Sequence, residues 1–229
     1  LQEGEPSWHP LICHMIDVAM VALRLWQYIL PPVVKEQMQA SLGLDNPEHA
    51  GRWVAYFAGL HDRGKASPHF AFKWREGAER LMAEGFKPPG VRRAVPHGFI
   101  TAYRMRDVLH RLGIKKANGV AIGRAVGAHH GLFPDPITMD DVRESVGGDR
   151  WRKAQDELAA LLAHILQVDT LPVPTGDLLS DNAFLIRLAG LTSVADWIGS
   201  NHDYFPFVGD DVRLPAYSRR ARWQAMKAL

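Results

Sequence analysis

The sequence has one cysteine, Cys13, so an internal disulfide framework is excluded and a reducing compartment fits. We also expect no secretory signal, because the first ten residues given hold two glutamates and two prolines and no apolar run. Its most apolar stretch, residues 11–30, is interrupted by Asp17 and Arg24. We therefore expect a cytoplasmic protein that does not span a membrane.

The overall composition is that of a globular protein. Hydrophobic residues make up 47% and charged residues 23% of the 229 positions, which excludes disorder, collagen and coiled coil as descriptions of the whole chain. This length allows one large domain or two small ones.

The net charge of +2 and the isoelectric point of about 8.8 are too mild to indicate a nucleic-acid partner by themselves. The basic residues are unevenly distributed, however. Residues 91–124 hold eight Lys or Arg against one acid, Asp107, and residues 212–229 hold five with no acid. Such stripes can bind phosphate backbones or can simply be solvated helix faces, and the sequence leaves both readings open.

Helical periodicity dominates the chain, and the connections between the periodic stretches are short. It predicts helices at about residues 11–30, 51–61, 68–84, 97–112, 117–129, 138–146, 151–166, 181–199 and 216–226. The best candidate for an extended piece is residues 168–173. The fold class is therefore all-α, with one domain over residues 1–229, a core at about 9–201 and a basic C-terminal tail at 211–229.

Histidines and acids occur in apolar or helix-terminal surroundings at several distant points of the sequence. His61-Asp62 ends an apolar helix just before a glycine, and His14 lies on the apolar stripe of the first helix, where a polar ring needs a partner. Taken alone, each is more often an ordinary structural residue. Asp196 is harder to explain, because an ionised carboxylate in a nearly uncharged apolar helix is costly unless it is paired or coordinated.

Two further histidine positions complete an ordered pattern. His97 follows a proline at a predicted helix start, and His129-His130 is a tandem pair at a helix end before Gly131. The spacings are long, so no short motif certifies the set. Its members together nevertheless predict one shared site.

This pattern resembles the HD superfamily of metal-dependent phosphohydrolases and, more narrowly, the HD nuclease domain of the type I CRISPR-associated helicase-nuclease. The resemblance covers about residues 11–201. Its motifs are His14-Met15-Ile16-Asp17-Val18-Ala19, His61-Asp62-Arg63-Gly64-Lys65, His97, His129-His130-Gly131 and Ser193-Val194-Ala195-Asp196-Trp197-Ile198-Gly199-Ser200. It implies a helical HD domain with a metal site between helices. The family's helicase needs a Walker-type loop, which this sequence lacks, so we expect a stand-alone nuclease subunit or an excised domain.

The resemblance also implies a role for each motif residue. A first metal site would use His14, His61, Asp62 and Asp196, and a second would use Asp62, His97, His129 and His130. Asp62 would bridge the two sites, and Lys65 would contact the phosphate or the bridging hydroxide. Five imidazoles and two carboxylates favour one or two divalent transition ions, namely Mn, Ni, Co or Fe, over Mg.

The implied function is metal-dependent hydrolysis of single-stranded DNA in CRISPR interference, in partnership with a helicase and an RNA-guided surveillance complex. Candidate DNA-binding residues, by charge and aromatic character, are Lys73, Trp74, Arg75, Arg92 and Arg93. Aromatic residues at such spacing are more often part of a core.

Two other functions remain open from the sequence. One is an HD phosphohydrolase acting on small nucleotides or cyclic dinucleotides, although the cyclic-dinucleotide branch has Gly-Tyr-Pro where this chain has Leu132-Phe133-Pro134. The other is a non-catalytic HD-fold module that binds nucleic acid or a protein, against which the full set of candidate ligands argues.

Overall fold

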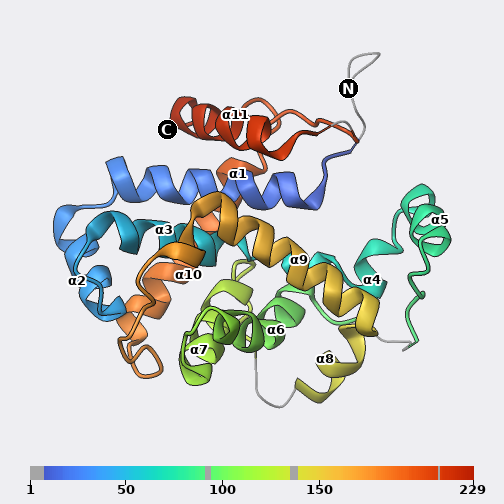
Figure 1. Ribbon diagram of the computed structural model, residues 1–229, viewed down its shortest axis with the longest axis horizontal. Helices are drawn as coiled ribbons and strands as arrows, with labels where there is room; N and C mark the ends of the chain where they lie inside the picture. The colour runs from blue at the N-terminus through green and yellow to red at the C-terminus, as the bar shows by residue number, and fades with distance from the viewer. Residues whose placement is uncertain (1–7, 91–93, 135–138, 211) are drawn as a thin grey trace.

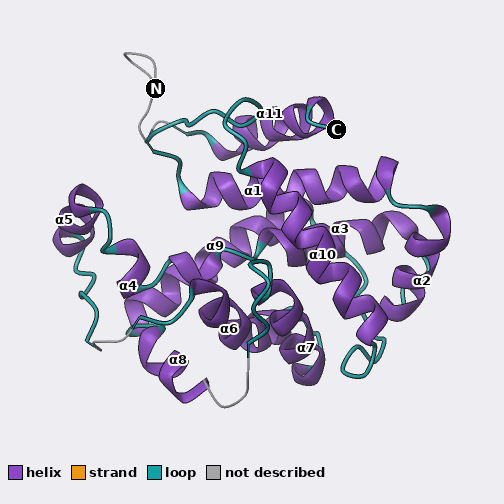
Figure 2. Cartoon of the chain, turned by 180° about the vertical axis from the view of Figure 1, so that it is seen from behind, coloured by secondary structure: helices purple, strands orange, loops and turns teal. Residues whose placement is uncertain are grey.

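Every regular element in the computed structural model is helical over the residues that it describes, which are 8–90, 94–134, 139–210 and 212–229 (Figure 2). The prediction of an all-α fold is therefore confirmed. The α-helices are α1 (Leu11–Arg24), α2 (Pro32–Leu42), α3 (Pro47–Gly59), α4 (Pro68–Ala71), α5 (Arg75–Ala83), α6 (His97–Arg111), α7 (Lys116–Gly127), α8 (Met139–Ser145), α9 (Asp149–Leu166), α10 (Asn182–Gly199) and α11 (Leu214–Lys227) (Figure 1).

Helix α1 is the centre of the hydrophobic core, and ten of its residues are buried. It contacts α3, α9, α10 and α11, and Figure 1 shows it between α11 on one side and α3 on the other. Three side chains of the basic tail, Tyr217, Ala221 and Ala225, belong to the same core cluster. The tail is thus a helix packed along α1.

With the π-helical turn that continues it, α1 forms a 19-residue segment, Leu11–Ile29, that is long and apolar enough to cross a membrane by length and composition alone. In the fold, 72% of its most apolar window is buried. A helix surrounded by other helices is apolar because it packs in the core, and this burial accounts for the hydropathy of the segment.

Helix starts follow the local sequence. The Asn46 side chain accepts hydrogen bonds from the backbone N–H groups of Glu48 and His49, and Asp181 caps α10 by accepting from the N–H of Phe184. Helix α2 was not predicted, because the Pro31-Pro32 pair reads as a stop. Pro32 instead occupies the first helical turn, where a missing N–H costs nothing.

Two other expectations were wrong in detail. The helix predicted at residues 68–84 is two helices, because the backbone at Trp74 is extended between α4 and α5. The extended piece predicted at 168–173 begins instead with a 3-10 turn at Val168–Thr170, which follows Gln167 in the left-handed region. Thr138, the first residue of the helix predicted at 138–146, lies outside the described residues.

Glycines bring α6 against its neighbours. A Cβ atom on Gly98 would lie 2.3 Å from the carbonyl oxygen of Gly127 in α7, and one on Gly64 would lie 2.0 Å from that of His97. No side chain fits at such distances, so backbone packs directly on backbone here. These contacts fix the first turn of α6, which carries His97.

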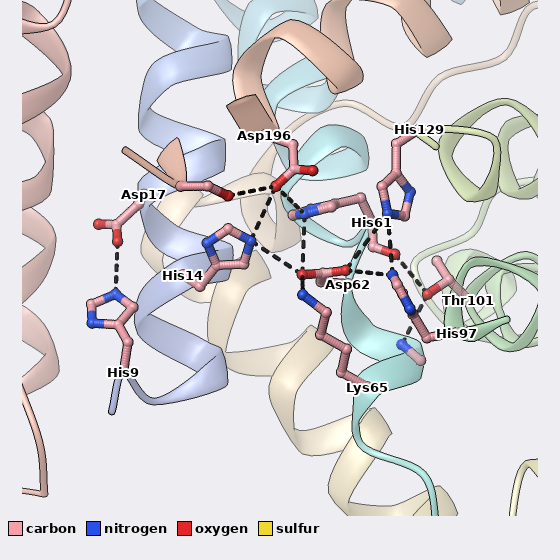
Figure 3. Close-up of polar contacts among 12 residues, drawn as sticks. His9, His14, Asp17, His61, Asp62, Lys65, His97, Thr101, His129 and Asp196 are labelled. Carbon is pink, nitrogen blue, oxygen red and sulfur yellow. Dashed lines mark hydrogen bonds and ion pairs between the residues drawn. The ribbon is translucent and has the colours of Figure 1, made fainter. Parts of the chain in front are cut away.

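A buried polar network joins α11 to α1. The Asp17 carboxylate is fully buried and accepts hydrogen bonds from the Tyr217 hydroxyl at 2.8 Å and from His9 Nε2 at 2.9 Å. Burial raises the pKa of Asp17, although both of these partners act to lower it. His9 is therefore occupied at Asp17, and Figure 3 shows the pair apart from the His61–Asp62 cluster.

Tyr217→Phe should destabilise the protein by about 2 kcal/mol, because it removes a hydrogen bond to a buried carboxylate and leaves that carboxylate with His9. This corresponds to a melting temperature lower by roughly 4–8 °C. Tyr204→Phe is the matched control, because Tyr204 is 40% exposed and its hydroxyl has no hydrogen-bond partner among the described residues, and it should change the melting temperature by less than about 2 °C. Equal effects of the two changes, measured by thermal denaturation, would contradict this role for Tyr217.

Candidate metal centre

Five separate segments bring histidines and acids to one place (Figure 3). His14 comes from α1, His61 and Asp62 follow α3, and His97 begins α6. His129 and His130 follow α7, and Asp196 lies in α10. The structure thus brings together all seven residues that the sequence analysis assigned to a metal site.

The residues form two groups whose possible ligand atoms lie within 4.8 Å of one another in each group. The first group contains His14, His61, Asp62 and Asp196, and the second contains His97, His129 and His130. Asp62 lies between them: its Oδ2 is 3.1 Å from His14 Nε2, and its Oδ1 is 2.9 Å from His97 Nε2. One carboxylate therefore presents one oxygen to each group.

Asp196 closes the first group from the side opposite Asp62. Its Oδ1 lies 3.3 Å from His14 Nε2 and 3.2 Å from His61 Nε2, and it accepts a hydrogen bond from the Ser200 hydroxyl at 3.1 Å. The carboxylate that seemed costly in an apolar helix is thus surrounded by polar partners.

Backbone hydrogen bonds orient two of the imidazoles in the same way. His61 Nδ1 lies 3.0 Å from the carbonyl oxygen of Ala58, and His129 Nδ1 lies 2.9 Å from that of Val126. A ring that donates from Nδ1 to a carbonyl carries the free lone pair of its neutral form on Nε2. Both Nε2 atoms point into the cluster, which is the orientation that a metal-binding histidine requires.

Hydrogen bonds alone do not satisfy the polar atoms of this cluster. Among the described residues, His14 Nε2 and both oxygens of Asp62 are buried without a partner of hydrogen-bonding geometry, although ion-pair distances are satisfied. His97 Nε2 and His129 Nε2 lie 3.3 Å apart, where two neutral lone pairs would repel. A divalent cation would satisfy all these atoms at once, so the donor set fits a metal centre.

Charge and burial have opposite effects on these groups. Burial alone disfavours a charged imidazole, but the carboxylates of Asp62 and Asp196 raise the pKa of His61 to about 9. Among the described residues His129 has an ion-pair contact with Asp62 alone, at 3.6 Å, so burial and the charge of His61 lower its pKa to about 4. The surrounding histidines, in turn, hold the pKa of Asp62 well below its usual range despite burial.

We expect the affinity of this cluster for a divalent metal to rise with pH, by about tenfold per unit until pH 9 for the His61 proton alone. Below its pKa of about 9 the His61 ring is protonated, and a metal ion has to displace that proton. His129, whose pKa is about 4, adds nothing to the slope above pH 5. Competition titrations with Ni²⁺ at pH 6.5, 7.5 and 8.5 measure this, and a flat profile would contradict it.

Lys65 ends the 3-10 turn Arg63–Lys65, and its ammonium group pairs with the Asp62 carboxylate. The predicted catalytic lysine therefore lies at the cluster. Lys73 and Trp74, at the junction of α4 and α5, are exposed, as is Arg75, while Arg92 and Arg93 lie outside the described residues.

Part of the basic stripe at residues 91–124 is used internally. The Arg104 guanidinium is mostly buried and pairs with Asp156 at 2.8 Å, and Arg111 pairs with the same carboxylate at 2.5 Å. Arg104 is therefore committed to an internal ion pair and is not part of a phosphate-binding surface, whereas the Arg111 side chain stays 55% exposed.

Sequence reasoning missed the residue that ties the His61 segment to α6. The Thr101 hydroxyl donates to the backbone carbonyl of His61 at 2.8 Å and accepts from the N–H of Gly64 at 2.9 Å. A threonine inside an amphipathic helix gives no signal of such a role. Ser200, which donates a hydrogen bond to Asp196, is the last residue of a motif named in the sequence analysis. Its place just after the helix was the one signal of this role in the sequence.

Comparison with known proteins places this cluster in context. The family model described as "Cas3, HD domain" matches residues 1–205. A CRISPR-associated endonuclease/helicase Cas3 from Thermus thermophilus is 32% identical over 230 residues, which cover 100% of this chain and 24% of that protein. The chain thus spans about a quarter of the length of this relative.

Two solved structures are similar over nearly the whole chain. A CRISPR-associated protein is 37% identical with a TM-score of 0.89, and the match covers 100% of this chain and 26% of that one. The Thermus thermophilus Cas3 HD domain, crystallised in the presence of Ni²⁺, is 29% identical with a TM-score of 0.75, over 96% of this chain and 84% of that domain.

Proposed function

The chain belongs to the family of Cas3 HD domains, and from that premise we propose that it is a metal-dependent nuclease that cuts single-stranded DNA. Its curated relatives are described as CRISPR-associated proteins with both nuclease and helicase parts. The chain covers only 24% of each of them, so their activity is proposed for it here on the strength of its own site.

The shared Asp62 carboxylate carries this proposal. One of its oxygens faces His14 and the other faces His97. Each oxygen of this one carboxylate is therefore next to a different group of imidazoles. Phosphodiester hydrolysis requires that a water molecule and the negative phosphate be held next to each other. A bridging acid that separates two cation positions by the width of one carboxylate is suited to this task.

Bound divalent ions would supply two kinds of chemistry, activation of water and neutralisation of charge on the phosphate. The chain's residues would divide accordingly: His14, His61 and Asp196 with Asp62 hold one ion, and His97, His129 and His130 with Asp62 hold the other. Five imidazoles and two carboxylates favour Mn, Ni, Co or Fe over Mg, which prefers an all-oxygen shell.

Lys65 would bind the substrate directly. Its ammonium group lies on Asp62 and its side chain is 28% exposed, so it can reach both the cluster and the solvent from which a phosphate arrives. A cation in this position pairs with a non-bridging phosphate oxygen and holds it against the centre.

The proposed partner is the helicase that forms most of the curated relatives, acting with the RNA-guided surveillance complex of CRISPR interference. A helicase moves along one strand of DNA, so it would deliver the unpaired substrate that a single-strand nuclease needs.

The direct test is to incubate the protein with circular single-stranded DNA and Mn²⁺ or Ni²⁺, with and without a chelator. We expect the circles to be cut only when the metal is present without the chelator. Because a closed circle has no ends, its cleavage shows that the protein cuts inside the strand. Intact DNA with every divalent metal would overturn the proposal. Faster turnover of free nucleotides than of DNA would favour a small-molecule phosphohydrolase instead.

A further inference from the structure

Phe70 in α4 is an aromatic side chain at the edge of the metal centre that the chemistry above does not use. Its ring centroid lies 5.5 Å from that of His97, in an edge-to-face arrangement. The residue is only half-buried, so part of its surface faces solvent. An accessible apolar surface therefore touches one of the proposed metal ligands.

Two lysines converge on this one ring. The Lys65 ammonium lies 5.4 Å from the Phe70 centroid, and that of Lys73 lies 4.8 Å from it. Lys65 also pairs with Asp62, whereas Lys73 has no carboxylate partner among the residues that the structure describes. Two like charges at one ring repel each other, and an anion bound between them would remove the repulsion.

We propose that Phe70, Lys65 and Lys73 form the binding position for the nucleotide next to the scissile phosphate. This inference rests on the proposed function. The base stacks on Phe70, in the place of the Lys73 ammonium, and that exposed lysine turns to a backbone phosphate while Lys65 holds the phosphate nearer the metal centre. Figure 3 shows the Lys65 side chain extending to the Asp62 carboxylate.

This position would select for single strands. An aromatic face accepts any unpaired base, because every base has a π surface, whereas bases in a duplex are already stacked and paired. The position thus gives the chain a reason to prefer an unpaired strand that does not depend on the helicase, and it predicts little preference among sequences.

The other aromatic side chains nearby contact rings or cations away from the metal centre, although Trp74 itself is 41% exposed. The Trp74 ring lies 5.6 Å from that of Trp8 and has the Arg80 guanidinium 5.9 Å above it, and the Phe72 ring packs edge-to-face with Trp151 at 6.2 Å. The stacking role expected at Trp74 therefore moves to Phe70, which is nearer the metal centre.

The test measures binding of fluorescein-labelled oligothymidylate by anisotropy, with metal-free protein in a chelator at low salt. Phe70→Leu should weaken binding about tenfold, and Phe70→Trp, which restores a stacking face, should stay within about twofold of the original protein. Lys73→Gln should weaken binding and lower its salt dependence by about one phosphate contact.

Trp223→Leu is the matched control. Trp223 is also an exposed aromatic residue with a lysine over its ring, Lys227 at 3.8 Å, but it lies on α11 away from the metal centre. We expect this change to leave the affinity as it is.

Equal affinities of the original protein and Phe70→Leu would overturn the inference, as would failure of Phe70→Trp to restore binding or the absence of measurable binding by the original protein. A loss of affinity in Trp223→Leu as large as in Phe70→Leu would overturn it as well. Because no metal is present, these outcomes are separate from the proposed function, which fails if DNA stays intact with every metal.

Discussion

Asp62→Asn should lower the rate of DNA hydrolysis by at least about 10³-fold, with the protein still folded. The change keeps the size of the side chain but replaces one charged oxygen with an amide NH₂, which cannot bind a metal. Because the two oxygens of Asp62 face His14 and His97, one of the two groups loses its ligand in either orientation of the amide. Both groups also lose the negative charge that attracts a cation.

The effect should be specific to this carboxylate. Asp203→Asn makes the same change on an exposed residue beyond the end of α10, and it should leave the rate within about twofold of the original. Cleavage of circular single-stranded DNA, metal content by elemental analysis and the melting temperature together measure the outcome. An Asp62→Asn protein that keeps its metal and most of its rate would remove Asp62 from the proposed chemistry.

Gly64→Ala should be the most destabilising small substitution near the site, by about 3 kcal/mol or more. The added Cβ would lie 2.0 Å from the carbonyl oxygen of His97 and 2.9 Å from the backbone N of Thr101. These are backbone atoms and cannot rotate away, so the turn and the start of α6 must separate. His97 moves with its own backbone. A displacement of this proposed metal ligand by about 1 Å would reduce the rate of DNA hydrolysis ~10²-fold.

Gly190→Ala is the control for this prediction. Gly190 is an exposed position inside α10, and a Cβ there meets nothing within 4 Å. The same substitution should therefore stabilise the protein by up to about 1 kcal/mol, because alanine favours helix. Thermal melts of both variants measure the difference, and a Gly64→Ala protein as stable as the original would show that the turn and α6 do not pack as described.

Much of the architecture could be predicted from the sequence because the helices are amphipathic and have recognisable ends. The errors occurred where a residue has two opposite local meanings. Pro32 ends one helix and starts the next, and Trp74 interrupts a stretch whose apolar pattern continues through it. Periodicity is insensitive to both, since it records which side chains are apolar and not where the backbone turns.

Some residues of the candidate site could be predicted from the sequence and others could not. His61 and Asp196 could be found because a polar group in apolar surroundings needs an explanation, and the family resemblance joined them across 135 positions. Thr101 and Phe70 could not be found, because a hydroxyl or an aromatic ring in a helix is unremarkable until its neighbours in space are known. Arg104 shows the converse, since a basic residue that suggests DNA binding in the sequence is an internal ion-pair partner in the fold.

The proposed function depends on whether the histidines and acids around Asp62 bind metal. Anomalous scattering from a crystal of the protein soaked in Mn²⁺ or Ni²⁺ tests this most directly. The account predicts a peak within about 2.3 Å of His61 Nε2 and Asp196, or two peaks with Asp62 between them. Peaks confined to other parts of the surface, with His61 and Asp196 still in contact with each other and no ion between them, would contradict it.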